Sequence, residues 1–285
     1  MNGLKTVLLL GLLSGLLLFG GQAIAGRQGL MIGLMLAVGL NFFSYFFSEK
    51  LALSMYHAQP VTPQDNPEVY RRVYPMVQNL IQRMNLPMPK LWVIPEDQPN
   101  AFATGRNPSH ASVAMTAGLL RMMNDRELEG VLAHELGHVL HRDILISSIA
   151  ATLGAAITHL AYMAMWFGGG GRDDEDRSPW GGLLMILLAP LASMLIQMAI
   201  SRTREYSADA AAAQYTGSPD GLIHGLRKLE QGVERIPMAD ANPSTAHMFI
   251  LNPFTGGGLS RLFSTHPSTE QRIAKLEALR FAQVH

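Results

Sequence analysis

Long hydrophobic runs alternate along this chain with charged segments that contain proline. Four runs consist almost entirely of apolar and small residues, and they cover residues 6–25, 30–47, 144–167 and 181–200. Each run is close to the about 20 residues that an α-helix needs to cross a bilayer core, and all four lack Lys and Arg. The pattern therefore predicts four membrane-spanning helices.

The first run also has features of a cleavable signal peptide. Lys5 precedes it, and Ala23-Ile24-Ala25 has the form of an A-x-A cleavage site. A second apolar run begins only a few residues later, however, and this arrangement favours a two-span hairpin that turns at residues 26–29. We therefore expect residues 1–48 to form a transmembrane hairpin.

The polar segment between the second and third runs, residues 49–143, is long enough for a folded soluble portion. Asn66 and Pro67 occupy the N-cap and first helical positions of an expected helix. Three short strands are predicted after this helix, at residues 91–94, 101–104 and 112–116, with a turn at 105–108 between the last two.

Residues 144–200 are expected to form a second hairpin. Its connecting loop at 168–182 contains four consecutive glycines and several acidic residues, and we interpret it as a solvated linker rather than a metal site. Residues 201–285 should be soluble again, with helices at 201–215, 219–231 and 267–281. The stretch 233–264, which is rich in Pro, Gly and Asn, predicts an irregular loop on the surface.

Composition agrees with a membrane protein, because 48% of the 285 residues are hydrophobic and only 15% are charged. The formal net charge is zero, so the charge balance does not indicate a nucleic-acid partner. The chain has no cysteine, which excludes disulfides and thiolate ligands. Any bound metal must therefore be held by histidine and carboxylate side chains.

The residues His134-Glu135-Leu136-Gly137-His138 form an H-E-x-x-H motif. On an α-helix, residues four apart lie on one face about 6 Å from each other, so the two imidazoles can bind one zinc ion. Glu135, one step round the helix, then faces the open coordination position, where metalloproteases place their general base. A surface helix with two solvated histidines is the alternative interpretation, but it leaves Glu135 unexplained.

The residues around the motif predict a helix. Asn124 is a suitable N-cap, and Glu127 three residues later completes a capping box. The apolar face of this helix consists of Leu128, Val131, Leu132, Leu136, Val139 and Leu140. Charged residues at 121–129 argue against an intramembrane protease and place the helix at the membrane surface.

A catalytic zinc usually takes three protein ligands, so another ligand is expected elsewhere in the chain. Glu205 is the best candidate, because it follows the fourth apolar run just as the motif precedes the third. A hairpin that crosses the membrane twice returns the chain to the same side and depth. The alternative for Glu205 is a salt bridge with Arg202 or Arg204. His141 lies about one helical turn beyond the midpoint of the two motif histidines, so its reach to their metal is poor.

Several segments along nearly the whole chain follow one family pattern. They are residues 99–105, the H-E-x-x-H motif with Asp143, residues 204–209 and residues 265–267, together with the apolar runs. In these segments the chain resembles the HtpX-like membrane metalloproteases, relatives of the CAAX prenyl protease, and no chemical position departs from the pattern. The resemblance implies an α-helical membrane protein with a mainly α zincin-type (gluzincin) catalytic domain that carries a small β-sheet.

The resemblance also implies roles for individual side chains. The expected ligands of one Zn²⁺ per subunit are His134, His138 and Glu205, with Glu135 as the catalytic base. Asp143 and Asp209 would accept the outer N–H groups of the ligand imidazoles and fix their tautomer. His266 matches a donor position near the scissile carbonyl.

Further residues match the place where such proteases bind an extended substrate along an edge strand. They are Asn100, Ala101, Phe102, Ala103 and Thr104. His159, inside the third run, is expected to form a hydrogen bond between helices. The sequence assigns no role to His247.

Together these expectations describe a zinc endopeptidase of the bacterial cytoplasmic (inner) membrane that cleaves cytosolic segments of misfolded or damaged membrane proteins, as in a stress response. Basic residues near the ends of membrane spans mark the cytosolic side, and here they follow the second and fourth runs: Lys50, Arg71, Arg72, Arg202 and Arg204. The catalytic portions are therefore expected in the cytosol. The expected partners are the lipid bilayer, membrane-protein substrates and other quality-control proteases.

Two alternatives remain open. A dedicated CAAX prenyl protease shares the motifs, although four apolar runs are fewer than that branch is expected to have. A membrane scaffold or chaperone would keep the fold without turnover.

Overall fold

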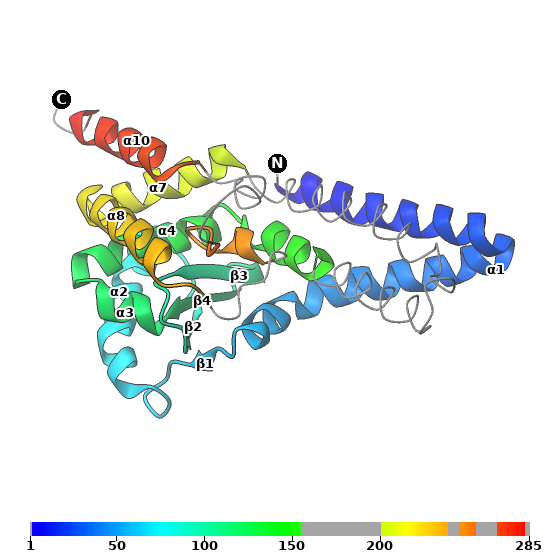
Figure 1. Ribbon diagram of the computed structural model, residues 1–285, viewed down its shortest axis with the longest axis horizontal. Coiled ribbons are helices and arrows are strands. Elements are labelled where there is room, and N and C mark those ends of the chain that lie inside the picture. The colour runs from blue at the N-terminus through cyan, green and yellow to red at the C-terminus, as the bar shows by residue number, and fades with distance from the viewer. Residues whose placement is uncertain (1, 155–200, 239–244, 255–266, 283–285) are drawn as a thin grey trace, which may run out of the picture.

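The computed structural model of the protein describes residues 2–154, 201–238, 245–254 and 267–282, in which helices surround one small sheet and a helical hairpin extends to one side (Figure 1). Most of the third apolar run, the whole fourth run and the loop at 168–182 lie outside the described residues. The same holds for His159 and His266.

Helix α1, Asn2–Met55, reverses direction at Gly26, where φ is +56° (Figure 1). A straight helix would separate Ser14 from Asn41 by about 40 Å at 1.5 Å per residue. Instead, the Asn41 side-chain amide donates to the Ser14 hydroxyl over 2.9 Å. The predicted reversal of the chain at residues 26–29 is therefore confirmed, and the two arms pack against each other.

The length of α1 bears on the predicted membrane spans. Within the described residues, one helix is long and apolar enough to cross a membrane, Gly26–Met55. Thr6–Phe19 and Ile144–Gly154 are shorter apolar helices. That the chain crosses a membrane four times thus stays a prediction.

The sheet has the strand order β1-β2-β4-β3. Its strands are β1 Gln59–Pro60, β2 Lys90–Ile94, β3 Ala101–Asn107 and β4 His110–Thr116. Strands β2 and β4 are parallel, and the β1–β2 and β3–β4 pairs are antiparallel. The three predicted strands are confirmed, and β3 lies at the edge of the sheet.

Helices pack on this sheet and on one another (Figure 1). They are α2 Pro67–Met84, α3 Ala117–Met122, α4 Asp125–Leu140, Ile144–Gly154, α7 Arg202–Thr216, α8 Asp220–Arg235 and α10 Thr269–Ala282. The predicted helices at 201–215, 219–231 and 267–281 are confirmed to within a few residues. Asn66 does not cap α2 with its side chain, because it has φ +59° and its amide donates to the Pro60 carbonyl.

Helix α4 is the central helix of the fold and lies between β3, α7 and α8 (Figure 1). The predicted capping box is confirmed: Glu127 N–H donates to Asn124 over 3.0 Å, and Asn124 N–H donates to Glu127 over 2.9 Å. Gly137 lets α4 approach α7 closely, because a Cβ there would lie 3.0 Å from the Ala208 Cα. The small side chains of Gly137 and Ala208 therefore allow the close packing that brings Glu205 toward α4.

The stretch 233–264 is predicted to be an irregular loop on the surface. The prediction is wrong for residues 233–235, which belong to α8, and residues 245–254 do not lie on the surface. The short 3₁₀ helix η2, Ala246–Met248, and the residues after it are buried. Phe249 is fully buried, and its ring makes edge-on contacts with Tyr56 and Phe102. The apolar residues Met248 to Leu251 account for the difference, since their burial offsets the cost of ordering an irregular segment.

Candidate metal centre

Two helices that are distant in the sequence bring three potential metal ligands together. Helix α4 contributes His134 and His138, and α7 contributes Glu205. The two Nε2 atoms are 3.2 Å apart, and the Glu205 carboxylate oxygens lie 3.7 Å from His134 Nε2 and 3.6 Å from His138 Nε2. Ligands bound tetrahedrally at about 2.1 Å from a zinc ion lie roughly 3.4 Å from one another. The donor atoms and their spacing thus fit a divalent metal.

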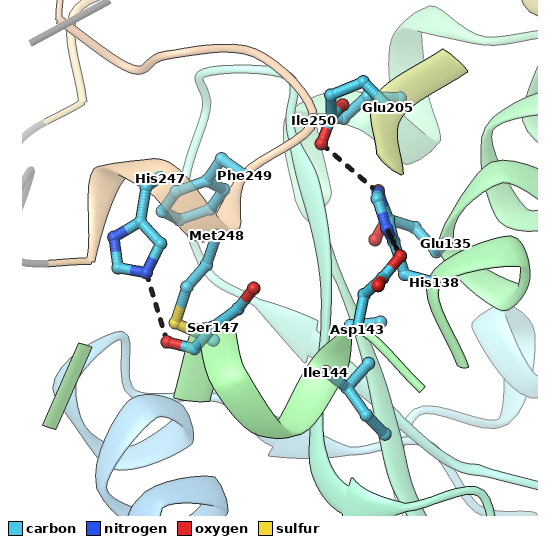
Figure 2. A pocket seen from close by; sticks show the side chains of 11 residues that line it. Glu135, His138, Asp143, Ile144, Ser147, Glu205, His247, Met248, Phe249 and Ile250 are labelled. Atoms are coloured by element: carbon cyan, nitrogen blue, oxygen red, sulfur yellow. Dashed lines mark hydrogen bonds and ion pairs between the residues drawn. The ribbon is translucent and has the colours of Figure 1, made fainter. Parts of the chain in front are cut away.

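A carboxylate lies behind each of the two imidazoles. His134 Nδ1 is 2.9 Å from Asp209 Oδ1, and His138 Nδ1 is 3.2 Å from Asp143 Oδ2 (the second pair is drawn in Figure 2). An Nδ1–H that donates to a carboxylate leaves the Nε2 lone pair free for a metal. Both carboxylates therefore occupy the places that the resemblance implied for them.

Burial and the charges around the site shift the pKa values of the two imidazoles in opposite directions. Burial, reinforced by the positive charge of Arg272, lowers the pKa of His134 to about 4. Burial also opposes protonation of His138, but the negative charge of Glu205 and the hydrogen bond with Asp143 outweigh it and raise the pKa of His138 to about 9. In the metal-free site, His138 is thus the imidazole that holds a proton at neutral pH.

Glu135 faces the same site from the next position on α4. Burial raises the pKa of its carboxyl group to about 7, while the nearby His138 opposes the rise. The backbone N–H of Ala103 donates to this carboxylate, but within the described part of the chain its Oε1 atom is buried and has no hydrogen-bond partner. A buried acceptor without a partner is unusual and indicates a place for a further polar group.

A cavity of about 30 Å³ lies beside these residues, and Glu135, His138 and Glu205 line it together with residues 248–250 (Figure 2). A water molecule needs about 10–15 Å³ of such volume. The cavity therefore has room for water-sized groups directly at the candidate ligands. His247, whose role the sequence left open, lines the cavity as well, and its Nε2 lies 3.1 Å from the Ser147 carbonyl oxygen.

Of the predicted substrate-binding residues on β3, only some lie at the cavity. Ala103 lines the cavity, whereas the Phe102 side chain packs between Tyr56 and Phe249. Thr104 shares a 2.7 Å hydrogen bond with the Ser148 hydroxyl. The side chains of Phe102 and Thr104 thus pack against residues of the same chain. Ala103 is the residue of this strand whose main chain faces the candidate site.

Asn100 and Ala101 hold the segment 245–254 in place. The Asn100 amide donates to the Leu251 carbonyl over 2.9 Å, and the Ile250 N–H donates to the Ala101 carbonyl over 3.0 Å. Asn100 is fully buried, so in this structure it contacts residues of its own chain at the place where a substrate strand was expected.

Sequence reasoning missed one residue of this site, Arg272 on α10. Its guanidinium is fully buried and makes two hydrogen bonds to Asp209, at 2.9 and 2.6 Å. Arg272 stands four residues before the buried Leu276 on the inner face of α10, and this spacing was the signal that the sequence offered. His141 lies at the exposed C-cap of α4, and the described ligand group does not include it.

Comparison with known proteins identifies the family. The model of "Peptidase family M48" matches residues 64–280, which includes every candidate ligand. The chain belongs to peptidase family M48. Family membership makes it a metalloprotease, the class that the H-E-x-x-H motif predicted.

The M48 relatives match along nearly the whole chain. A protein named "Protease HtpX homolog" from Methylibium petroleiphilum is 51% identical over 280 residues, 98% of both chains. Proteins with the same name from Burkholderia mallei and Burkholderia pseudomallei are 51% identical over 277 residues, 96% of both chains. The predicted resemblance to this group is confirmed.

A solved structure shares the fold. The crystal structure of S. mikatae Ste24p aligns with a TM-score of 0.50 and 21% sequence identity over 97% of this chain. The alignment spans 63% of the Ste24p chain. At this identity the likeness concerns the fold.

Proposed function

We propose that the chain is a membrane-bound zinc endopeptidase that cuts cytosolic segments of misfolded or damaged membrane proteins. The observation that carries the proposal is the group His134, His138 and Glu205, whose ligand atoms all lie within 4.8 Å of one another beside the buried Glu135. This arrangement has a metal-binding face and a proton acceptor at one cavity, as hydrolysis of a peptide bond requires.

The three ligands would hold Zn²⁺, which, when bound, acts as a Lewis acid and lowers the pKa of water from about 15.7 to about 7. Glu135 accepts a proton from water at Oε1 and returns it to the leaving amine, so that the carboxylate ends as it began. Asp143 and Asp209 hold the imidazoles in the tautomer that keeps both Nε2 lone pairs toward the metal. His266 would donate a hydrogen bond to the carbonyl oxygen as negative charge develops.

The position of the cavity beside the apolar elements supports this substrate class. Ile144, the first residue of helix Ile144–Gly154, lines the cavity. Farther along the same helix, Ile149 and Leu153 are buried in one cluster with Leu13 of α1. The candidate site thus lies where the soluble domain joins its apolar helices, and we infer that extended segments at a membrane surface are its substrates.

A cleavage assay in detergent tests this proposal. The purified protein should contain about one zinc per chain and should cut an unfolded membrane protein, and a chelator should abolish the cleavage until zinc is restored. A protein that binds zinc and cuts nothing would favour the scaffold or chaperone alternative. Cleavage confined to prenylated C-terminal peptides would favour the CAAX prenyl protease alternative.

A further inference from the structure

Arg272 is a fully buried cation that lies against the candidate metal centre. It comes from α10, an element that contributes no ligand among the described residues. Buried arginines are rare unless several partners satisfy the guanidinium, because removing the charge from water is unfavourable. The partners of Arg272 therefore indicate its purpose.

The strongest partner is Asp209. Arg272 Nε and Nη2 donate to the two carboxylate oxygens of Asp209, which is a bidentate contact with fixed geometry. The oxygen that accepts from Nη2, Oδ1, is also the one that lies 2.9 Å from His134 Nδ1. A single carboxylate thus joins the arginine to the metal-binding imidazole.

Arg272 also lies close to His134 itself, at 3.2 Å from Nη2 to Nδ1. Two tautomers of His134 compete at this point. A hydrogen bond from Arg272 to Nδ1 would move the proton to Nε2 and block metal binding, whereas donation from Nδ1–H to Asp209 leaves Nε2 free. Because Asp209 is nearer and is held by two hydrogen bonds, the second arrangement prevails.

We propose that Arg272 is a positioning residue for the metal ligand His134, and that it acts by fixing Asp209. This inference rests on the proposed metal site of the preceding section. Arg272 Nη1 also donates to the Ile250 carbonyl over 3.0 Å, so the same side chain holds the segment that lines the cavity. Arg272 thereby ties α10 and this segment to one ligand of the metal.

Metal affinity of the purified full-length protein tests the proposal. Zinc affinity is measured by competition with a chelator, and the coordination geometry is read from the visible absorption of the Co²⁺-substituted protein. Arg272→Gln should lower the affinity by about 10- to 100-fold and alter the cobalt spectrum, since Asp209 loses its anchor. Arg272→Lys should recover part of the loss, because an ammonium supplies the charge but not the planar fork.

Leu276→Ala is the matched control. Leu276 is fully buried one helical turn farther along α10, so its truncation weakens the packing of this helix without touching Asp209. The variant should unfold at a lower temperature and keep the wild-type metal affinity. Equal losses of metal affinity in Leu276→Ala and Arg272→Gln would show that Arg272 merely anchors α10, and would overturn the proposal.

A double-variant cycle with Asp209→Asn separates the remaining cases. If Arg272 acts through Asp209, adding Arg272→Lys to Asp209→Asn should lower the metal affinity little further. Fully additive losses would overturn the proposal, and this comparison stays decisive if Arg272→Gln does not fold. Wild-type protein without metal affinity would refute the proposed function itself, whereas normal affinity in the wild type and in both Arg272 variants would refute only the role of Arg272.

Discussion

Glu135 differs from its neighbours in the site because it lies at the cavity without belonging to the ligand group. Glu135→Gln keeps the shape of the side chain but cannot accept a proton from water. We expect the variant to retain wild-type zinc content and to lose peptidase activity by at least about 10²-fold. Zinc analysis and a cleavage assay on the same preparation measure both quantities. Near-normal cleavage with zinc bound would contradict the role of Glu135 as base.

We expect metal binding to depend on pH through His138. Its pKa of about 9 in the metal-free site means that a proton must leave before the metal binds, whereas His134, with a pKa of about 4, is already neutral. Zinc affinity should therefore rise by about tenfold per pH unit between about pH 6 and pH 8, and fall as the pH is lowered. Titration with zinc at several pH values measures the slope.

Asp143→Asn is the control for this pH dependence. Removing the negative charge of Asp143 lowers the pKa of His138, so the dependence should move to lower pH. A zinc affinity that is the same at pH 6 and pH 8 in the wild type would show that His138 does not carry the proton.

At the scale of elements, the contact of α4 with α7 decides whether the three ligands meet. A Cβ at Gly137 would lie 3.0 Å from the Ala208 Cα and 3.1 Å from its carbonyl oxygen, and these backbone atoms cannot move aside alone. Gly137→Val should push α7 away together with Glu205, weaken zinc binding and destabilise the fold by about 1–3 kcal/mol. Chelator competition and thermal unfolding measure the two effects.

Gly39→Ala on α1 is the comparison for Gly137→Val, because an added Cβ there meets no atom within 4 Å. It should leave zinc affinity unchanged. If Gly137→Val binds zinc as tightly as Gly39→Ala, the close packing of α4 on α7 is not what places Glu205.

The sequence was most informative where local chemistry determines structure. The capping box of Asn124 and Glu127 located the start of α4, and the H-E-x-x-H spacing placed both histidines on one face of it. The match of Glu205 to these histidines came from chain topology and family resemblance. It could be predicted because the charged segment around Glu205 follows an apolar run directly.

What the sequence did not disclose depends on tertiary contacts. Arg272 looks like any helical arginine until Asp209 and Ile250 surround it, and no periodicity names those partners. Residues 245–254 lie in a Pro- and Gly-containing stretch, so the apolar signal of Met248 to Leu251 was outweighed. In both cases a residue is buried by contacts with segments that are distant in the sequence, and a local pattern does not reveal such contacts.

For the whole molecule, the distribution of Lys and Arg predicts that the catalytic portions lie on the cytosolic side of the membrane. Single cysteines in this cysteine-free chain test it, one at Ser109 and one at Ser178. Ser109 is exposed in the β3–β4 turn, whereas the nearby Ser112 is fully buried and unsuitable for labelling. A membrane-impermeant thiol reagent on intact cells should label the cysteine at 178 and not the one at 109. The opposite result would place the catalytic portion outside the cytoplasm.

The ligands come from distant stretches of one chain, and this separation sets an order of events during synthesis. His134 and His138 are translated well before Glu205, and Arg272 follows later still. A nascent chain therefore carries two histidines without the carboxylate that completes the donor set. We therefore expect a chain that is still being translated, or one truncated before residue 205, to lack peptidase activity, because its proposed metal site is incomplete. By this reasoning, activity requires that α7, which carries Glu205, has been made and has packed against α4.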